Sequence, residues 1–232
     1  MKKVAEMTNE LEKEIIIYAK IGDPSGFRMA DATEEHFQVE NLLANGSKLR
    51  ARKTTKSGVD QYKLTLKQKV KGPTSAIAEN NEFSMDITPE FFAAFREASS
   101  KFIRKTRFIF NSKSVKVKLT GHNRTTEVEL PSVIYEVDVF HVDHKNKCLW
   151  CKIEVEVQNL DAFIRQNYPD LIDVTTSIKV SHLPFKPEDG FVMSDDATEE
   201  QVALVDELWN DYFSHDLVTD HDSHDKVFQH TW

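Results

Sequence analysis

Charged and apolar residues alternate along several stretches of this chain. In Lys152–Val157 the carboxylates Glu154 and Glu156 are separated by apolar residues, whereas in Leu49–Arg52 and Tyr62–Lys67 the alternating charges are basic. Because a β-strand turns successive side chains to opposite faces, each stretch is predicted to be a strand with one charged and one apolar face. The apolar face belongs in a core, so the charged face points either to bulk water or into a closed polar interior.

The same reading predicts a mostly antiparallel β-protein with a few helices. Strands are expected over 10–17, 48–53, 61–70, 82–87, 105–110, 115–119, 127–130, 135–141, 149–157 and 173–180. Helices are expected over 33–43, from Pro89 onward and over 198–213, with a helical turn at 161–166; Thr33 and Thr88 stand at helix starts. The hairpin turns are expected at Ser57-Gly58 and at 121–123. Eight such strands can close into a barrel whose interior holds side chains or one small ligand.

Composition narrows the class of protein. The chain has 232 residues, 40% of them hydrophobic, and a formal net charge of -8, which fits one domain with appendages or two small ones. It has no apolar run of membrane-spanning length and no apolar segment near Met1 of the kind found in signal peptides, so a cytoplasmic protein is expected. Cys148 and Cys151 are interpreted as free thiols of a reducing compartment.

The charges are distributed unevenly. Between Lys48 and Lys71 the only acid is Asp60, residues 101–124 contain no acid, and residues 187–225 contain no Lys or Arg. This asymmetry indicates an anionic ligand for the body and a solvated or shielding acidic tail. The acidic total and the lack of aromatic residues between the bases argue against nucleic acid.

Two sets of residues carry candidate chemistry. The alternating carboxylates suit a hard divalent cation such as Mg²⁺ or Mn²⁺, although an exposed charged sheet face would show the same pattern; they are Glu10, Glu12, Asp138, Glu154 and Glu156. The alternating bases suit the oxygens of a polyphosphate, with solubility as the alternative explanation; they are Arg50, Arg52, Lys63, Lys67, Lys105 and Arg107.

Several of these motifs occur in an order that resembles one family. Tyr135–His141, followed by Leu149 and Lys152–Glu156, resembles the W-E-I-D-x-F-H-G … A-E-I-E-L core of the CYTH superfamily, the triphosphate tunnel metalloenzymes. The other matching segments are similar to that family's R-x-R … Y-x-L-T-x-K, E-F-E-x-E-I, K-x-R-Y and E-V-T motifs; they are Leu49–Arg52 with Tyr62–Lys67, Glu82–Ile87, Lys105–Phe108 and Asp173–Thr175. The family's opening E-x-E-x-K departs here, because Glu14 follows Glu10 and Glu12 where the lysine is expected.

The resemblance implies an α+β protein built on a closed eight-stranded antiparallel tunnel. Residues 9–185 would form it, after a flexible 1–8 and before an acidic extension, 186–232, with one helix. It implies Mg²⁺ or Mn²⁺ on the carboxylates, a linear triphosphate on the bases and on Lys179, and hydrolysis that depends on Glu154, Glu156, Lys67 and Arg107. An RNA 5′-triphosphate end is the one nucleic-acid partner this allows.

Three alternatives stay open at this point. The first is a binding module of the same fold without catalysis, which is indicated by Glu14 in place of the expected lysine. The second is an adenylyl cyclase of that fold. The third is a β-rich interaction protein whose acidic tail binds a partner. The oligomeric state is left open as well.

Overall fold

The computed structural model describes residues 7–21, 24–70, 77–99, 101–120, 125–141, 150–156, 166–167, 179–181, 187–193 and 197–212. Its strands are β1 (Thr8–Ile21), β2 (Ala32–Leu42), β3 (Lys48–Lys56), β4 (Val59–Val70), β5 (Ala78–Asp86), β6 (Phe102–Thr120), β7 (Thr125–Phe140), β8 (Trp150–Glu156), β9 (Lys179–Ser181) and β10 (Pro187–Val192). Its helices are η1 (Pro24–Met29), α1 (Pro89–Glu97) and α3 (Glu199–Tyr212). Cys148 and the segments 121–123, 161–165, 173–178 and 213–232 of the sequence predictions lie outside the described residues.

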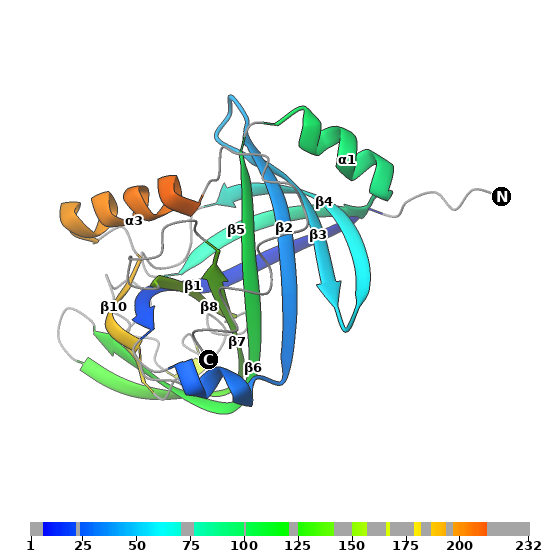
Figure 1. The fold of residues 1–232 in the computed structure, drawn as a ribbon. Helices are drawn as coiled ribbons and strands as arrows, with labels where there is room; N and C mark the ends of the chain where they lie inside the picture. Colours follow the sequence, from blue (N-terminus) through cyan, green and yellow to red (C-terminus); the bar gives the residue numbers. More distant parts are fainter. Residues whose placement is uncertain are drawn as a thin grey trace.

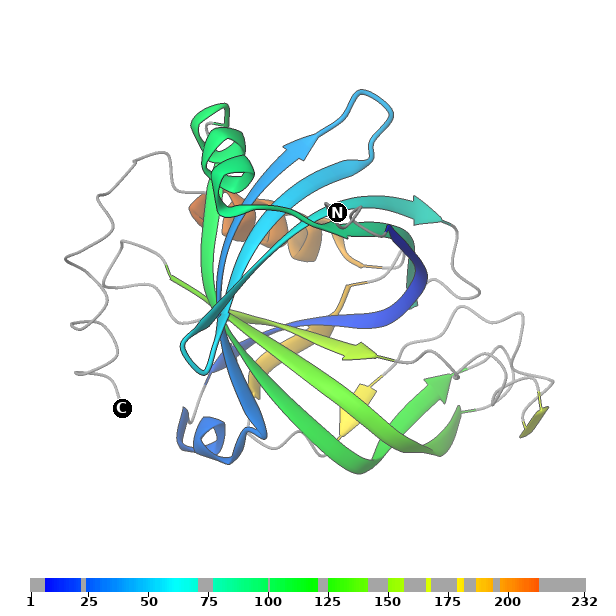
Figure 2. The same cartoon turned by 90° about the vertical axis from the view of Figure 1, so that its right-hand side faces the viewer.

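Eight strands close into an antiparallel barrel, as the sequence predicts. Their order is β1-β5-β4-β3-β2-β6-β7-β8, and β8 pairs with β1 to complete the ring. The first half of β1 pairs with β5 and its second half with β8, while β10 pairs with the end of β1. Figure 1 and Figure 2 show the strands wrapping round, with α1 and α3 apart from one another on the outside of the ring.

The prediction of a helix over 33–43 is wrong, because these residues form β2. Thr33 followed by two glutamates imitates a helix start, but β2 pairs along its length with β3 on one side and β6 on the other. Two complete ladders satisfy its backbone and outweigh local helical propensity. Asn45-Gly46 then forms the turn to β3, with Gly46 at a φ of 80° that favours glycine.

Several other predicted elements are confirmed, some with longer bounds. The stretches 105–110 and 115–119 both belong to one strand, β6. The stretches 127–130 and 135–141 both belong to β7, which ends at Phe140. The four predicted strands are therefore two long strands, which pair with each other. The β3–β4 turn lies at Ser57-Gly58, both with positive φ. Helix α1 begins after Thr88, whose hydroxyl accepts a hydrogen bond from the Phe91 amide at 3.2 Å. Helix α3 confirms the helix predicted over 198–213 as far as Tyr212.

The main apolar core lies on the outer face of the ring. Ile15 and Ile17 of β1 and Ile153 and Val155 of β8 alternate with the charged residues of those strands and pack into one buried cluster. Phe27 of η1 covers this cluster and stacks on Phe108 with ring centroids 4.6 Å apart. Since the apolar faces of β1, β6, β7 and β8 are turned outward into this cluster, the charged faces of these strands are turned inward. The interior is where the candidate chemistry lies.

Candidate functional site

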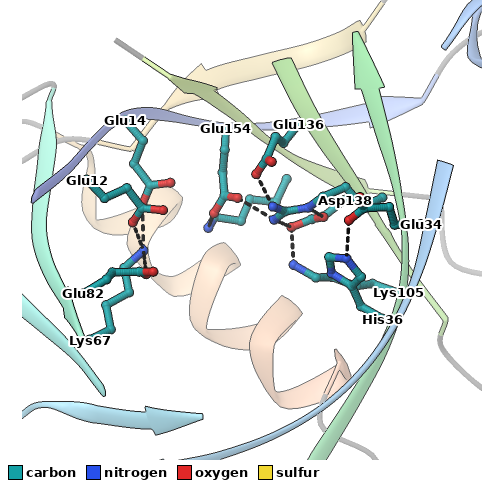
Figure 3. Close-up of polar contacts among 12 residues, drawn as sticks. Glu12, Glu14, Glu34, His36, Lys67, Glu82, Lys105, Glu136, Asp138 and Glu154 are labelled. Carbon is teal, nitrogen blue, oxygen red and sulfur yellow. Dashed lines mark hydrogen bonds and ion pairs between the residues drawn. The ribbon is translucent and has the colours of Figure 1, made fainter. Parts of the chain in front are cut away.

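The interior of the barrel has walls of opposite charge. Strands β3 and β4 contribute mostly bases, and strands β1, β7 and β8 contribute mostly carboxylates. In Figure 3 one group of side chains surrounds Lys67 and another surrounds Asp138, with Glu154 between them. Helix α3 passes behind and below both groups in this view. The alternation read from the sequence therefore identified the faces correctly.

Lys67 of β4 is the centre of the first group. Its Nζ is bound closely by Glu12 and lies 3.2 Å from Glu14 Oε1 and 3.2 Å from Glu82 Oε1. Burial lowers the pKa of Lys67, but Glu14 and Glu12 outweigh this effect and hold it above its ordinary value. A base that contacts carboxylates on the neighbouring β5 and on β1 beyond it in this way stays charged at any physiological pH.

Arg107 of β6 is the centre of the second group. It donates to Asp138 through Nε at 2.7 Å and to Glu154 through a terminal nitrogen at 2.6 Å, and it contacts Glu136 closely. Lys105 contacts Asp138 as well. Burial raises the pKa of Asp138, but Arg107 and Lys105 outweigh it and keep this carboxyl ionised. The result is a buried network that joins three adjacent strands.

Arg52 of β3 differs from these bases, because it has no hydrogen bond or ion pair among the described residues. The register explains this, since its neighbours across the ladders are the neutral Gln38 and the basic Lys63. Burial, then Arg50 and Arg107, lower the pKa of Arg52 to about 10, against the attraction of Glu136 and Asp138. A partly buried guanidinium that forms no direct ion pair with a described carboxylate suits an anionic ligand on this wall.

On the acidic wall, carboxylates crowd together. The pKa of Glu14 is raised to about 7 by burial and by Glu154, against Lys152 and Lys67. That of Glu136 is also raised to about 7, by burial and then by Glu154 and Asp138, which outweigh Arg107. Glu156 lies directly opposite Glu14, and its pKa is raised by burial and by Glu12. Such mutual repulsion is relieved by a proton or by a cation.

The donor type of this wall fits a hard divalent cation. Carboxylate oxygens are the ligands that Mg²⁺ and Mn²⁺ prefer, and the repulsion among Glu14, Glu136 and Glu156 favours a positive charge there. Within the described part of the chain, however, no three His, Cys, Asp or Glu side chains are gathered as a ready metal centre. Asp138 and Glu154 are instead occupied by bases.

The remaining residues predicted for the site fall at different depths. Arg50 lies in the interior, 3.5 Å from Glu82, whereas Glu10 and Lys63 are exposed near the ends of their strands. Lys179 lies on β9, which pairs with β6 at Lys118 and is not one of the eight strands of the ring.

Other interior residues were missed from the sequence. Lys152 and Glu136 lie two positions before Glu154 and Asp138, so they share the interior face of β8 and of β7. Glu82 of β5 lies directly opposite Lys67 of β4. Two more, His36 and Gln38, were hidden by the mistaken helix. The ring of His36 is neutral, because burial lowers its pKa to about 3, and its Nε2 lies 3.0 Å from Glu34.

Helix α3 closes one end of the interior. The interior faces of β1, β6, β7 and β8 end in apolar residues that pack against this helix; they are Ile16, Tyr18, Ile103, Phe140 and Trp150. Trp209 of α3 donates a hydrogen bond to the Tyr18 hydroxyl at 2.8 Å, and Tyr212 stacks on Phe140 with centroids 3.9 Å apart. The polar interior is therefore bounded by an aromatic floor.

No family model and no curated protein matches the chain. Among solved structures, it is similar to the PH1819 protein of Pyrococcus horikoshii, with 12% identity, a TM-score of 0.42, and 83% of this chain and 99% of that chain covered. A conserved hypothetical protein of Pyrococcus furiosus has 18% identity and a TM-score of 0.39 over 62% and 78%. The PH1012 protein of P. horikoshii has 14% identity and a TM-score of 0.41 over 69% and 90%.

None of the described helices combines the length and the apolar character that crossing a bilayer requires.

Proposed function

We propose that this protein hydrolyses a linear triphosphate, with a divalent cation, inside its barrel, as the resemblance to the triphosphate tunnel metalloenzymes implies. The observation that carries the proposal is Arg52, a partly buried guanidinium that forms no hydrogen bond or ion pair with the described residues, on a basic wall that faces an acidic one. A ligand made of a polyanion and a cation is complementary to both walls. Neither a lone anion nor a lone cation is.

The chain's own residues have distinct roles in this proposal. Arg50, Arg52 and Lys63 of the basic wall, with Lys67, bind and orient the phosphate chain, and Lys105 and Arg107 neutralise charge at its end. The carboxylates that would hold Mg²⁺ or Mn²⁺ are Glu10, Glu12, Asp138, Glu154 and Glu156. The bound ion supplies charge neutralisation and lowers the pKa of a bound water. Because phosphoryl transfer depends mainly on positioning and electrostatics, a rigid barrel suits it.

One observation favours a second candidate, a binding protein of the same fold without turnover. Glu14 occupies the position where the resemblance places a lysine, and it lies 3.2 Å from Lys67 Nζ. A carboxylate there takes part of the positive charge of Lys67 away from the phosphate chain. The ligand would still be bound by the other bases, but the charge that builds up during transfer would be less well stabilised.

Product analysis tests the proposal. Purified protein is incubated with tripolyphosphate or ATP and Mg²⁺ or Mn²⁺, beside the Glu154→Gln/Glu156→Gln variant. We expect orthophosphate from the wild type and none from the variant. Stoichiometric binding without any product identifies the binding protein, and cyclic AMP with pyrophosphate identifies a cyclase. Absence of both binding and turnover refutes the proposal.

A further inference from the structure

Lys152 lies on the interior face of β8, close to the end that α3 closes. It is directly opposite Asp138 of β7 and Tyr18 of β1, and its side chain is only 13% exposed. Trp150, the next interior residue on this strand, already packs in the aromatic floor. Lys152 is therefore the deepest base that β8 presents to the interior, and the sequence analysis assigned it no role.

The partner of Lys152 is a carboxylate of the proposed cation site. Its Nζ contacts one oxygen of Glu154 closely, and the other oxygen accepts a hydrogen bond from Arg107 at 2.6 Å. The same arrangement recurs on the opposite side, where Lys67 holds Glu12. In each case a base next to the proposed phosphate site is neutralised by an acid of the proposed cation site.

This pairing has a consequence for binding. A divalent cation that takes the Glu154 carboxylate weakens the hold of that carboxylate on Lys152. An ammonium group in this mostly buried position then keeps only the attraction of Glu14, Tyr18 and Asp138, so a further anion beside it is favourable. The phosphate chain is that anion, and it in turn needs a free base. Each ligand thus removes the obstacle to the other, which is positive coupling between two sites.

We propose that Lys152 is a further phosphate-binding residue, held by Glu154 until a divalent cation takes that carboxylate, so that cation and triphosphate bind together. The inference rests on the proposed function. It adds a phosphate-binding residue, and it states that Glu154 passes from Lys152 to the cation while Lys152 passes to the phosphate chain.

Isothermal titration calorimetry tests this with Mn²⁺ alone, tripolyphosphate in EDTA, and tripolyphosphate with Mn²⁺. In Lys152→Met we expect tighter binding of Mn²⁺ alone, because Glu154 is released. We expect weaker binding of tripolyphosphate with Mn²⁺, by about 10- to 100-fold, as for the loss of one charge-assisted hydrogen bond. The control is Lys53→Met, which removes the same charge from the outer face of β3, where Lys53 pairs with Asp60.

The opposite signs of the two effects separate this role from a structural one, which would weaken both ligands or neither. Glu154→Gln gives an independent test, because it releases Lys152 and should tighten tripolyphosphate binding in EDTA. The proposal is overturned if Lys152→Met behaves as Lys53→Met, if it weakens both ligands, or if Glu154→Gln leaves metal-free affinity unchanged. If Lys152→Met does not fold, the titration of Glu154→Gln with tripolyphosphate in EDTA decides the test. A wild type that binds neither ligand refutes the proposed function itself.

Discussion

Replacing Arg52 with methionine should stabilise the unliganded protein. Arg52 is a base in the interior, and its neighbours across the ladders are Gln38 and Lys63. It forms no ion pair or hydrogen bond with the described residues. Methionine keeps an apolar stem of similar length and removes the charge. The change therefore relieves a cost of folding that only an anionic ligand otherwise offsets.

The size of the effect follows from the pKa of Arg52. It falls from 12.5 to about 10 on folding, through burial and then through Arg50 and Arg107. One pKa unit corresponds to about 1.4 kcal/mol, so the shift amounts to about 3 kcal/mol against the charged form. Arg52 is only partly buried, and water in the interior screens its charge. We therefore expect a gain of about 1–2 kcal/mol in the free energy of unfolding.

Urea and thermal unfolding measure this gain directly. For a chain of this size it corresponds to a rise of about 2–8 °C in Tm. Lys53→Met is the matched control, because Lys53 follows Arg52 on the same strand but faces outward and pairs with Asp60 at 3.0 Å; its effect should stay within about 0.5 kcal/mol. If Arg52→Met is less stable than wild type, or no more stable than the control, Arg52 is paired in solution and our reasoning fails.

Three further predictions concern the closing helix, the acidic wall and α1. Leu208→Ala should lower the free energy of unfolding by about 2–4 kcal/mol, because Leu208 of α3 is 7% exposed and packs in the cluster between this helix and the barrel; an unchanged urea midpoint would contradict this. Glu14 has a pKa raised to about 7, so the folded protein keeps a proton that the unfolded chain loses, and stability should fall as pH rises from about 4.5 to 7. Glu14→Gln should flatten this part of the stability profile, and an unchanged slope would show that Glu14 is not responsible. Thr88→Ala removes the cap of α1 and should cost about 1 kcal/mol in unfolding free energy, whereas Thr88→Ser should keep most of it.

The alternation of charged and apolar residues was sufficient to predict most strands and to separate their charged faces from their apolar faces, but it left open whether the charged faces meet water or a closed interior. Glu154 and Glu156 illustrate why, because a period of two fixes the face of every residue once one face is buried. For β2 the same reasoning failed. Thr33, Glu34 and Glu35 satisfy the local rules for a helix start, and only pairing with β3 and β6 reveals a strand.

Which charges meet inside the barrel could not be read from spacing. Arg107 binds carboxylates on both β7 and β8, and Lys67 binds carboxylates on β1, because these strands lie one or two places away in the sheet although they are distant in the sequence. Those partners are set by register and shear, which depend on the whole sheet. For the same reason the isolation of Arg52 and the pairing of Lys152 with Glu154 became visible only in the structure.

The most direct test of the central claim is a calorimetric titration of tripolyphosphate, with Mg²⁺, into wild type and Arg52→Met. We predict saturable binding by the wild type that weakens with added salt, and a loss of about 10- to 100-fold in the variant, as for one charge-assisted contact. Absence of wild-type binding, or equal affinity of the two proteins, would contradict the claim that the interior of this barrel is a polyphosphate site.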